Sequence, residues 1–208
     1  MKAHTKETQS KMTPETSLEE LKNGNKRFVD RQKLNRDLMQ QVSETSNGQY
    51  PFATVLSCID SRVSSELIFD QGIGDIFSVR IAGNFVNEDI LGSMEFACKL
   101  AGTKLIVVLG HTACGAVKGA CDHARLGNLT ALINKIEPAV DAVNEPHDQS
   151  LRNSSNIEFV NRVAEKNVDM TISEIRSSSP VLNEMEKNGE IKIVGGMYDI
   201  SSGLVSFN

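Results

Sequence analysis

The chain has 208 residues, of which 39% are hydrophobic and 24% are charged, and this composition predicts one globular domain rather than a disordered chain. Its net charge of −5 offers no basic surface for nucleic acid or anionic lipid, and no apolar run approaches the roughly 20 residues that cross a membrane. The four cysteines lack the spacing of a disulfide framework, which favours metal binding or thiol chemistry.

The N-terminal segment is polar and has no apolar core. We therefore expect a flexible tail at residues 1–16, without a signal peptide, and a single domain over residues 17–208. This predicts a cytoplasmic protein; a periplasmic location is the alternative, because a polar stretch also remains after a leader is cleaved. Residues 17–20 (SLEE) match a capping box, and the apolar residues after them predict an N-terminal helical arm, although Gly24 opposes helix formation.

The rest of the chain alternates between strand and helix patterns. Short apolar or β-branched runs predict strands, and apolar residues at helical spacing predict helices. We expect strands at 52–57, 76–81, 104–110, 191–194 and 204–207, and helices over most of 89–101, 115–145 and 155–177. This alternation predicts an α/β fold with a mainly parallel central sheet flanked by helices, closed by a C-terminal antiparallel strand pair.

Two stretches rich in chemically active side chains follow predicted buried strands. They are residues 58–62 (CIDSR) and 111–115 (HTACG). Ligands gather beyond the carboxyl ends of parallel strands where the strand order reverses, so Cys58, His111 and Cys114 would converge there if the two strands are neighbours. Two thiolates and one imidazole are ligands that zinc accepts, and three protein ligands leave a fourth position for water. The sequence therefore predicts a zinc site of the catalytic kind.

Asp60 and Arg62 lie two residues apart, so their side chains share one side of an extended segment, and the guanidinium can bind the carboxylate through two hydrogen bonds. Beside a metal, two roles are open to Asp60. It closes the site as a fourth ligand, or Arg62 draws it away and leaves that position open. The commoner role of such a couple is a surface ion pair, and an isolated cysteine, such as Cys98 or Cys121, is more often a small buried hydrophobe.

The two stretches resemble the motifs of the β-class carbonic anhydrases, Cys-x-Asp-x-Arg and His-x-x-Cys. Flanking matches extend over roughly residues 17–207 and include 80–84 (RIAGN), 93–97 (SMEFA) and 195–199 (GGMYD). The resemblance implies reversible hydration of CO₂ to bicarbonate and a proton, through attack by a zinc-bound hydroxide.

Carried over residue by residue, the resemblance implies that Cys58, His111 and Cys114 bind one Zn²⁺ per subunit and that Asp60 and Arg62 form the catalytic dyad. The remaining matched positions are those of the substrate pocket: Gln49, Phe77, Ala82, Phe96 and Gly115. From the sequence alone, Phe77 and Phe96 are equally explained as core aromatics, which is the commoner role of a single aromatic residue. Ala82 stands where the family usually has a larger valine, which changes the expected shape of the pocket.

The resemblance also implies a homodimer or homotetramer with active sites at the subunit interface. Two alternatives keep the fold and the metal. One acts on carbon disulfide or carbonyl sulfide, and the other is a non-catalytic, zinc-stabilised interaction module in which Asp60 stays on the metal. Thiol redox chemistry at Cys114 lacks a supporting Cys-x-x-Cys pair. Hydration of CO₂ is the main hypothesis.

Overall fold

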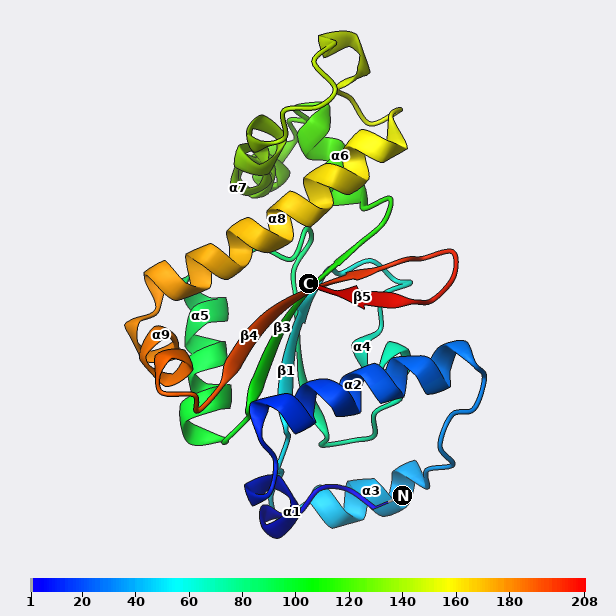
Figure 1. The fold of residues 1–208 in the computed structure, drawn as a ribbon, viewed down its shortest axis with the longest axis vertical. Coiled ribbons are helices and arrows are strands. Elements are labelled where there is room, and N and C mark those ends of the chain that lie inside the picture. Colours follow the sequence, from blue (N-terminus) through cyan, green and yellow to red (C-terminus); the bar gives the residue numbers. More distant parts are fainter. Residues whose placement is uncertain (1) are drawn as a thin grey trace.

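A computed structural model describes residues 2–208 and shows a central twisted sheet between layers of helices (Figure 1). The sheet has five strands in the order β2-β1-β3-β4-β5. The strands are β1 (Ala53–Ser57), β2 (Ile76–Arg80), β3 (Leu105–His111), β4 (Lys192–Tyr198) and β5 (Val205–Phe207). The first four are parallel, and β5 pairs antiparallel with β4. The predicted α/β fold with its C-terminal antiparallel pair is confirmed.

Helices cover both faces of the sheet. They are α1 (Lys6–Ser10), α2 (Pro14–Val29), α3 (Leu38–Thr45), α4 (Ser65–Ile68), α5 (Glu88–Glu95), α6 (Gly115–Cys121), α7 (Gly127–Ala142), α8 (Ile157–Ser178) and α9 (Pro180–Lys187). A π-helical turn, Phe96–Leu100, continues α5, and a short 3₁₀ turn, Gln149–Leu151, precedes α8. Within residues 2–208, no helix combines the length and the apolar character that a membrane crossing requires.

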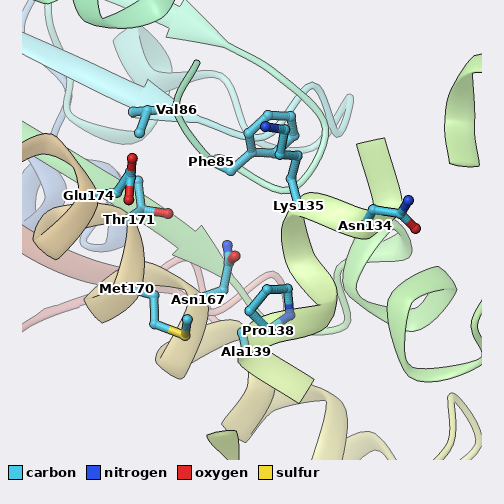
Figure 2. Close-up of a pocket in the computed structure, with 10 residues that line it drawn as sticks. All are labelled: Phe85, Val86, Asn134, Lys135, Pro138, Ala139, Asn167, Met170, Thr171 and Glu174. Atoms are coloured by element: carbon cyan, nitrogen blue, oxygen red, sulfur yellow. The ribbon is translucent and has the colours of Figure 1, made fainter. Parts of the chain in front are cut away.

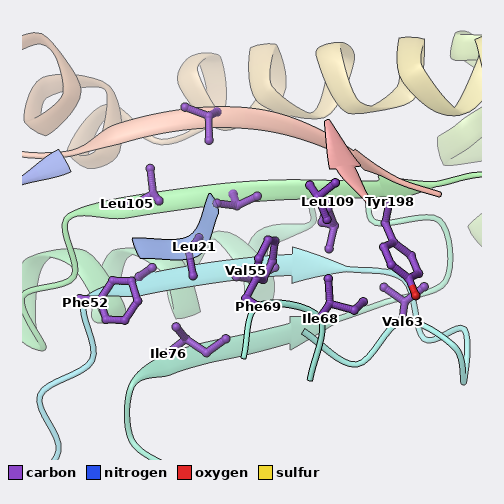
Figure 3. Close-up of a cluster of buried hydrophobic side chains, with 14 residues drawn as sticks. Leu21, Phe52, Val55, Val63, Ile68, Phe69, Ile76, Leu105, Leu109 and Tyr198 are labelled. Carbon is purple, nitrogen blue, oxygen red and sulfur yellow. The ribbon is translucent and has the colours of Figure 1, made fainter. Parts of the chain in front are cut away.

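Strands β1 and β3 form the centre of the core, and every one of their residues is buried. Alternate side chains point to opposite layers. On one face, Val55 and Leu109 pack with Leu21 of α2 (Figure 3). On the other, Leu56 and Val108 pack with residues of α5, α8 and α9. Burial on both faces explains why these strands are continuous apolar runs rather than alternating ones.

The first long helix starts earlier than the sequence predicted. Helix α2 begins at Pro14, and its N-cap is Thr13, whose hydroxyl accepts a hydrogen bond from the amide of Thr16. Ser17 is buried inside the helix, so the predicted capping box at residues 17–20 is wrong. A proline in the first turn needs no amide partner there, which makes Thr13-Pro14 the stronger start signal.

The segment predicted as a flexible tail is folded in the structure, apart from Met1, which lies outside the described residues. Helix α1 occupies Lys6–Ser10. The side-chain amide of Gln9 donates hydrogen bonds to the carbonyl oxygens of Pro51 (2.6 Å) and Ala101 (2.8 Å). These bonds attach the segment to the residues that precede β1 and β3. Local periodicity in the sequence does not predict such long-range contacts.

At Gly24, α2 packs closely against the segment that follows α4. A Cβ atom at this position would lie 1.8 Å from the backbone oxygen of Phe69. We expect Gly24→Ala to lower the free energy of unfolding by about 1–3 kcal/mol, although alanine is the better helix former by about 1 kcal/mol. Urea unfolding measures this change. Gly92→Ala is the matched control, because that helical glycine has nothing within 4 Å of its added Cβ and the substitution should stabilise. Equal stability of the parent and Gly24→Ala would contradict the close packing.

Candidate metal centre

The strand order brings the two motif stretches together. The connection after β1 leads to β2 on one side of β1, and the next connection leads to β3 on its other side. The strand order therefore reverses between β1 and β3. Cys58 directly follows β1, His111 is the last residue of β3, and Cys114 is the N-cap of α6. All three therefore lie at the carboxyl edge of the sheet, at its topological switch point, where α/β folds bind ligands.

The spacing of the three side chains fits a tetrahedral metal site. One ligand atom from each of Cys58, His111 and Cys114 lies within 4.8 Å of the others, and all three residues are buried. The two sulfur atoms are 3.9 Å apart. Two thiolates bound about 2.3 Å from a tetrahedral Zn²⁺ lie about 3.8 Å apart, so the observed separation matches this ion.

The orientation of His111 also fits metal binding. Its Nδ1 donates a hydrogen bond to the carbonyl oxygen of Thr112 at 3.0 Å. Its Nε2 is buried and has no hydrogen-bond partner within residues 2–208. A neutral imidazole held through one nitrogen presents the lone pair of the other, and this is the usual arrangement of a metal-binding histidine.

The two cysteines strongly affect one another's ionisation. The Cys114 thiol lowers the pKa of Cys58 to about 4 against the opposing effect of burial, with help from His111 and the backbone amide of Gly83. The Cys58 thiolate, together with burial, raises the pKa of Cys114. Two thiols in contact keep one proton between them unless a cation replaces it. Metal binding would release that proton and hold both sulfurs as thiolates.

Asp60 lies next to this cluster and is held by Arg62. The guanidinium Nε and Nη2 donate to Oδ1 (2.9 Å) and Oδ2 (2.7 Å) of the carboxylate, and the Arg62 amide also donates to Oδ1 (3.0 Å). These bonds hold the pKa of Asp60 well below its usual range. Oδ2 lies 4.0 Å from Nε2 of His111, so the ionised carboxylate lies beside the cluster at this residue.

Arg80 fixes the backbone of the loop that carries Cys58 and Asp60. Its Nε donates to the carbonyl oxygen of Cys58 (3.0 Å), and its Nη2 donates to that of Asp60 (2.7 Å). The loop that follows β1 is therefore held against the end of the neighbouring strand β2. Arg80 belongs to a stretch that matches the family, but its position at the end of a strand gave no sign of this role.

Comparisons with known proteins agree with the geometry. A family model described as carbonic anhydrase matches residues 53–205. Carbonic anhydrase 2 of Mycobacterium tuberculosis is 33% identical, and the match covers 91% of this chain and 90% of that protein. The carbonic anhydrase of Mycolicibacterium smegmatis is 32% identical, with 92% of each chain covered. This chain belongs to the β-class carbonic anhydrase family.

Solved structures of β-carbonic anhydrases share the fold. That of CafA from Aspergillus fumigatus has a TM-score of 0.70 and 26% identity, covering 93% of this chain and 89% of its own. One of the tetrameric β-carbonic anhydrases from Sordaria macrospora has a TM-score of 0.68 and 25% identity, covering 79% of this chain and 84% of its own. Hydration of CO₂ is the general activity of the family.

The positions matched to the β-carbonic anhydrase substrate pocket fall into two groups. Ala82 precedes Gly83, whose amide contacts Cys58, and the exposed Gly115 directly follows Cys114. Both residues therefore adjoin the cluster of Cys58, His111 and Cys114. Phe77 and Phe96 have ring centroids 6.3 Å apart in a shallow groove formed by β2 and α5.

Gln49 is exposed and precedes β1, whereas Cys58 follows this strand at its other end. A single chain therefore brings the Cys58–His111–Cys114 cluster and the Asp60–Arg62 pair together but keeps Gln49 apart from them. The aromatic pair likewise lines a groove to which none of the three cluster residues contributes.

Proposed function

We propose that this protein catalyses the reversible hydration of CO₂ to bicarbonate and a proton, with one Zn²⁺ held by Cys58, His111 and Cys114. The observation that carries the proposal is the convergence of these three buried ligands beside an ionised, arginine-held Asp60. When bound, zinc supplies a Lewis acid that lowers the pKa of a water molecule toward neutrality.

In this proposal Asp60 orients the nucleophile. Its carboxylate lies beside the cluster at His111 and has only acceptor atoms, so it accepts a hydrogen bond from the attacking water or hydroxide and fixes its direction. Arg62 keeps the carboxylate ionised across the neutral range and donates a hydrogen bond to each of its two oxygens. This attachment supports an open fourth position rather than Asp60 as a permanent ligand.

We further propose that the active form is a homodimer or homotetramer. Tetrameric structures are reported for the Sordaria relatives, and the placement of Gln49, Phe77 and Phe96 away from the cluster of their own chain is consistent with pockets completed by a second subunit. Sedimentation analysis of the zinc-loaded protein should give a dimer or a larger assembly. A fully active monomer would contradict this part of the proposal.

The proposed activity can be tested by combining a zinc determination with stopped-flow CO₂ hydration over roughly pH 6.5–9, a range around the zinc–water pKa of about 7. We expect one zinc per chain, hydration well above the buffer rate, loss of hydration after removal of zinc by a chelator, and recovery after zinc is returned. Zinc-loaded protein that hydrates CO₂ no faster than buffer would overturn the proposed activity and leave the fold unaffected.

A further inference from the structure

Helix α8 packs closely behind the metal centre. It crosses the sheet from the region of α9 to that of α6 (Figure 1). Its contact with β3 is tight at Gly110, where a Cβ atom would lie 2.7 Å from Cγ2 of Val168. Gly110 directly precedes the ligand His111. This approach brings two asparagine side chains of α8 to the two loops that carry the proposed ligands.

Asn167 reaches the turn that contacts Cys58. It is 3% exposed, and its Nδ2 donates a 2.8 Å hydrogen bond to the carbonyl oxygen of Gly83. The amide of Gly83 in turn lies 3.4 Å from Sγ of Cys58 and donates to it. Gly83 has a φ of +78°, in a turn closed by a 3.0 Å hydrogen bond from the amide of Asn84 to the carbonyl oxygen of Ile81. Asn167 therefore holds a residue whose amide donates to this sulfur.

Asn161 holds the other ligand loop. Ala113 lies between His111 and Cys114 and has a φ of +53°. The left-handed conformation is sterically unfavourable for an alanine, so the turn needs support from its surroundings. The amide of Ala113 donates a 2.9 Å hydrogen bond to Oδ1 of Asn161. This bond links the strained turn directly to α8.

We propose that Asn161 and Asn167 are positioning residues that hold the two ligand-bearing loops in the geometry that binds metal, so that α8 sets the metal affinity of the centre. The inference rests on the proposed function, because it concerns the same metal. Groups that hold a ligand in place typically change metal affinity by about 10- to 100-fold when they are removed. The two side chains have opposite hydrogen-bonding roles: Asn167 donates a hydrogen bond to its loop, and Asn161 accepts one.

A cavity beside Asn167 makes substitution there practicable. Asn167 lines a cavity of about 280 Å³. Figure 2 shows this cavity between α7, α8 and the segment that follows β2. A polar replacement at 167 therefore has space on one side. Thr171 lies one helical turn further along α8, is also buried and also lines this cavity. Within the described part of the chain, its hydroxyl makes no hydrogen bond to either ligand loop, so Thr171→Val is a matched control.

The test places the same substitution at both positions and measures zinc affinity by competition with a chromophoric chelator. Asn161→Asp keeps an acceptor for the Ala113 amide and should bind zinc as the parent does. Asn167→Asp puts a carboxylate against the carbonyl oxygen of Gly83 and should weaken zinc binding by about 10- to 100-fold. In the Co²⁺-substituted protein, Asn167→Asp should also shift the thiolate-to-cobalt absorption, because the Gly83 amide no longer points at Cys58.

Asn167→Leu provides the second variant at that position, because it removes the donor without adding a charge and should weaken zinc binding in the same direction. Asn161→Leu should also weaken it, whereas Thr171→Val should not. Urea unfolding of the metal-free proteins shows whether each variant is folded. Zinc affinities of Asn167→Asp and Asn167→Leu equal to that of Thr171→Val would overturn the inference and leave the proposed function standing. A parent protein that binds no zinc would overturn both.

Discussion

An Asp60→Asn variant is expected to keep its zinc and to lose about 10²- to 10³-fold of its CO₂ hydration rate, the range typical of removing one preorganised hydrogen-bonding group from an active site. The substitution preserves the shape of the side chain but replaces one acceptor oxygen with a donor. It also breaks the two-point attachment to Arg62, whose hydrogen bonds at 2.9 and 2.7 Å require two acceptors. Stopped-flow hydration and a zinc determination on the same sample measure both quantities.

Two further variants serve as controls for Asp60→Asn. His111→Ala removes a buried ligand nitrogen and should lose zinc and activity together. Ser61→Ala changes the exposed residue between Asp60 and Arg62 and should leave zinc content and activity unchanged. Because Arg62 holds the pKa of Asp60 far below neutrality, the rate lost by Asp60→Asn should be the same factor at both ends of the measured pH range. Hydration by Asp60→Asn at the parent rate would show that Asp60 is not part of the machinery.

The parts of the site that the sequence predicted are those set by local chain geometry. Cys58 and His111 lie at the carboxyl ends of β1 and β3, whose short apolar runs are easily recognised in the sequence as buried strands. Neighbouring parallel strands bring their carboxyl ends together. Asp60 and Arg62 are close in sequence, so their pairing needs no long-range contact. The fold class followed in the same way from the alternation of strand and helix patterns.

The parts that the sequence did not predict depend on contacts between distant residues. Gln49 is nine positions from Cys58, yet the five residues of β1, each about 3.3 Å long, stand between them. Asn167 meets Gly83 across 84 positions. Its one local signal is a polar amide on the buried face of α8, between Ala164 and Val168. A buried asparagine on an apolar helix face needs a partner, and the sequence does not identify it.

A buried ion-pair network away from the metal centre carries the other large expected effect. Asp70 is 4% exposed and receives hydrogen bonds from Arg27 (2.6 Å), Arg36 (2.6 Å) and the amide of Leu34 (3.2 Å). Arg36 also donates to the backbone oxygen of Asp70. Burial raises the pKa of Asp70, but these donors outweigh it and hold the pKa below its usual value. The network joins α2, the loop before α3 and the end of α4.

Asp70→Asn is expected to lower the free energy of unfolding at pH 7 by about 3–5 kcal/mol, because it leaves the buried guanidinium of Arg36 without its counter-charge and leaves the partly buried Arg27 with Glu20 alone. Asparagine tolerates the left-handed backbone at this position, where φ is +46°, so the loss reports the charge rather than strain. The depressed pKa means that the ionised carboxylate stabilises the parent fully above about pH 5, and that this advantage is lost progressively as the pH falls from the unfolded-state pKa of about 3.9 toward the lower pKa of the folded protein.

Urea unfolding of parent and variant between pH 7 and pH 3 should therefore show two stability curves that converge on the acidic side. Asp30→Asn is the control, since Asp30 forms an exposed ion pair with Lys26 on the surface of α2 and should change stability by no more than about 0.5 kcal/mol. If Asp70→Asn were no more destabilising than this control, or if its deficit persisted undiminished at the lowest pH, the charge of Asp70 would not be what holds the three segments together.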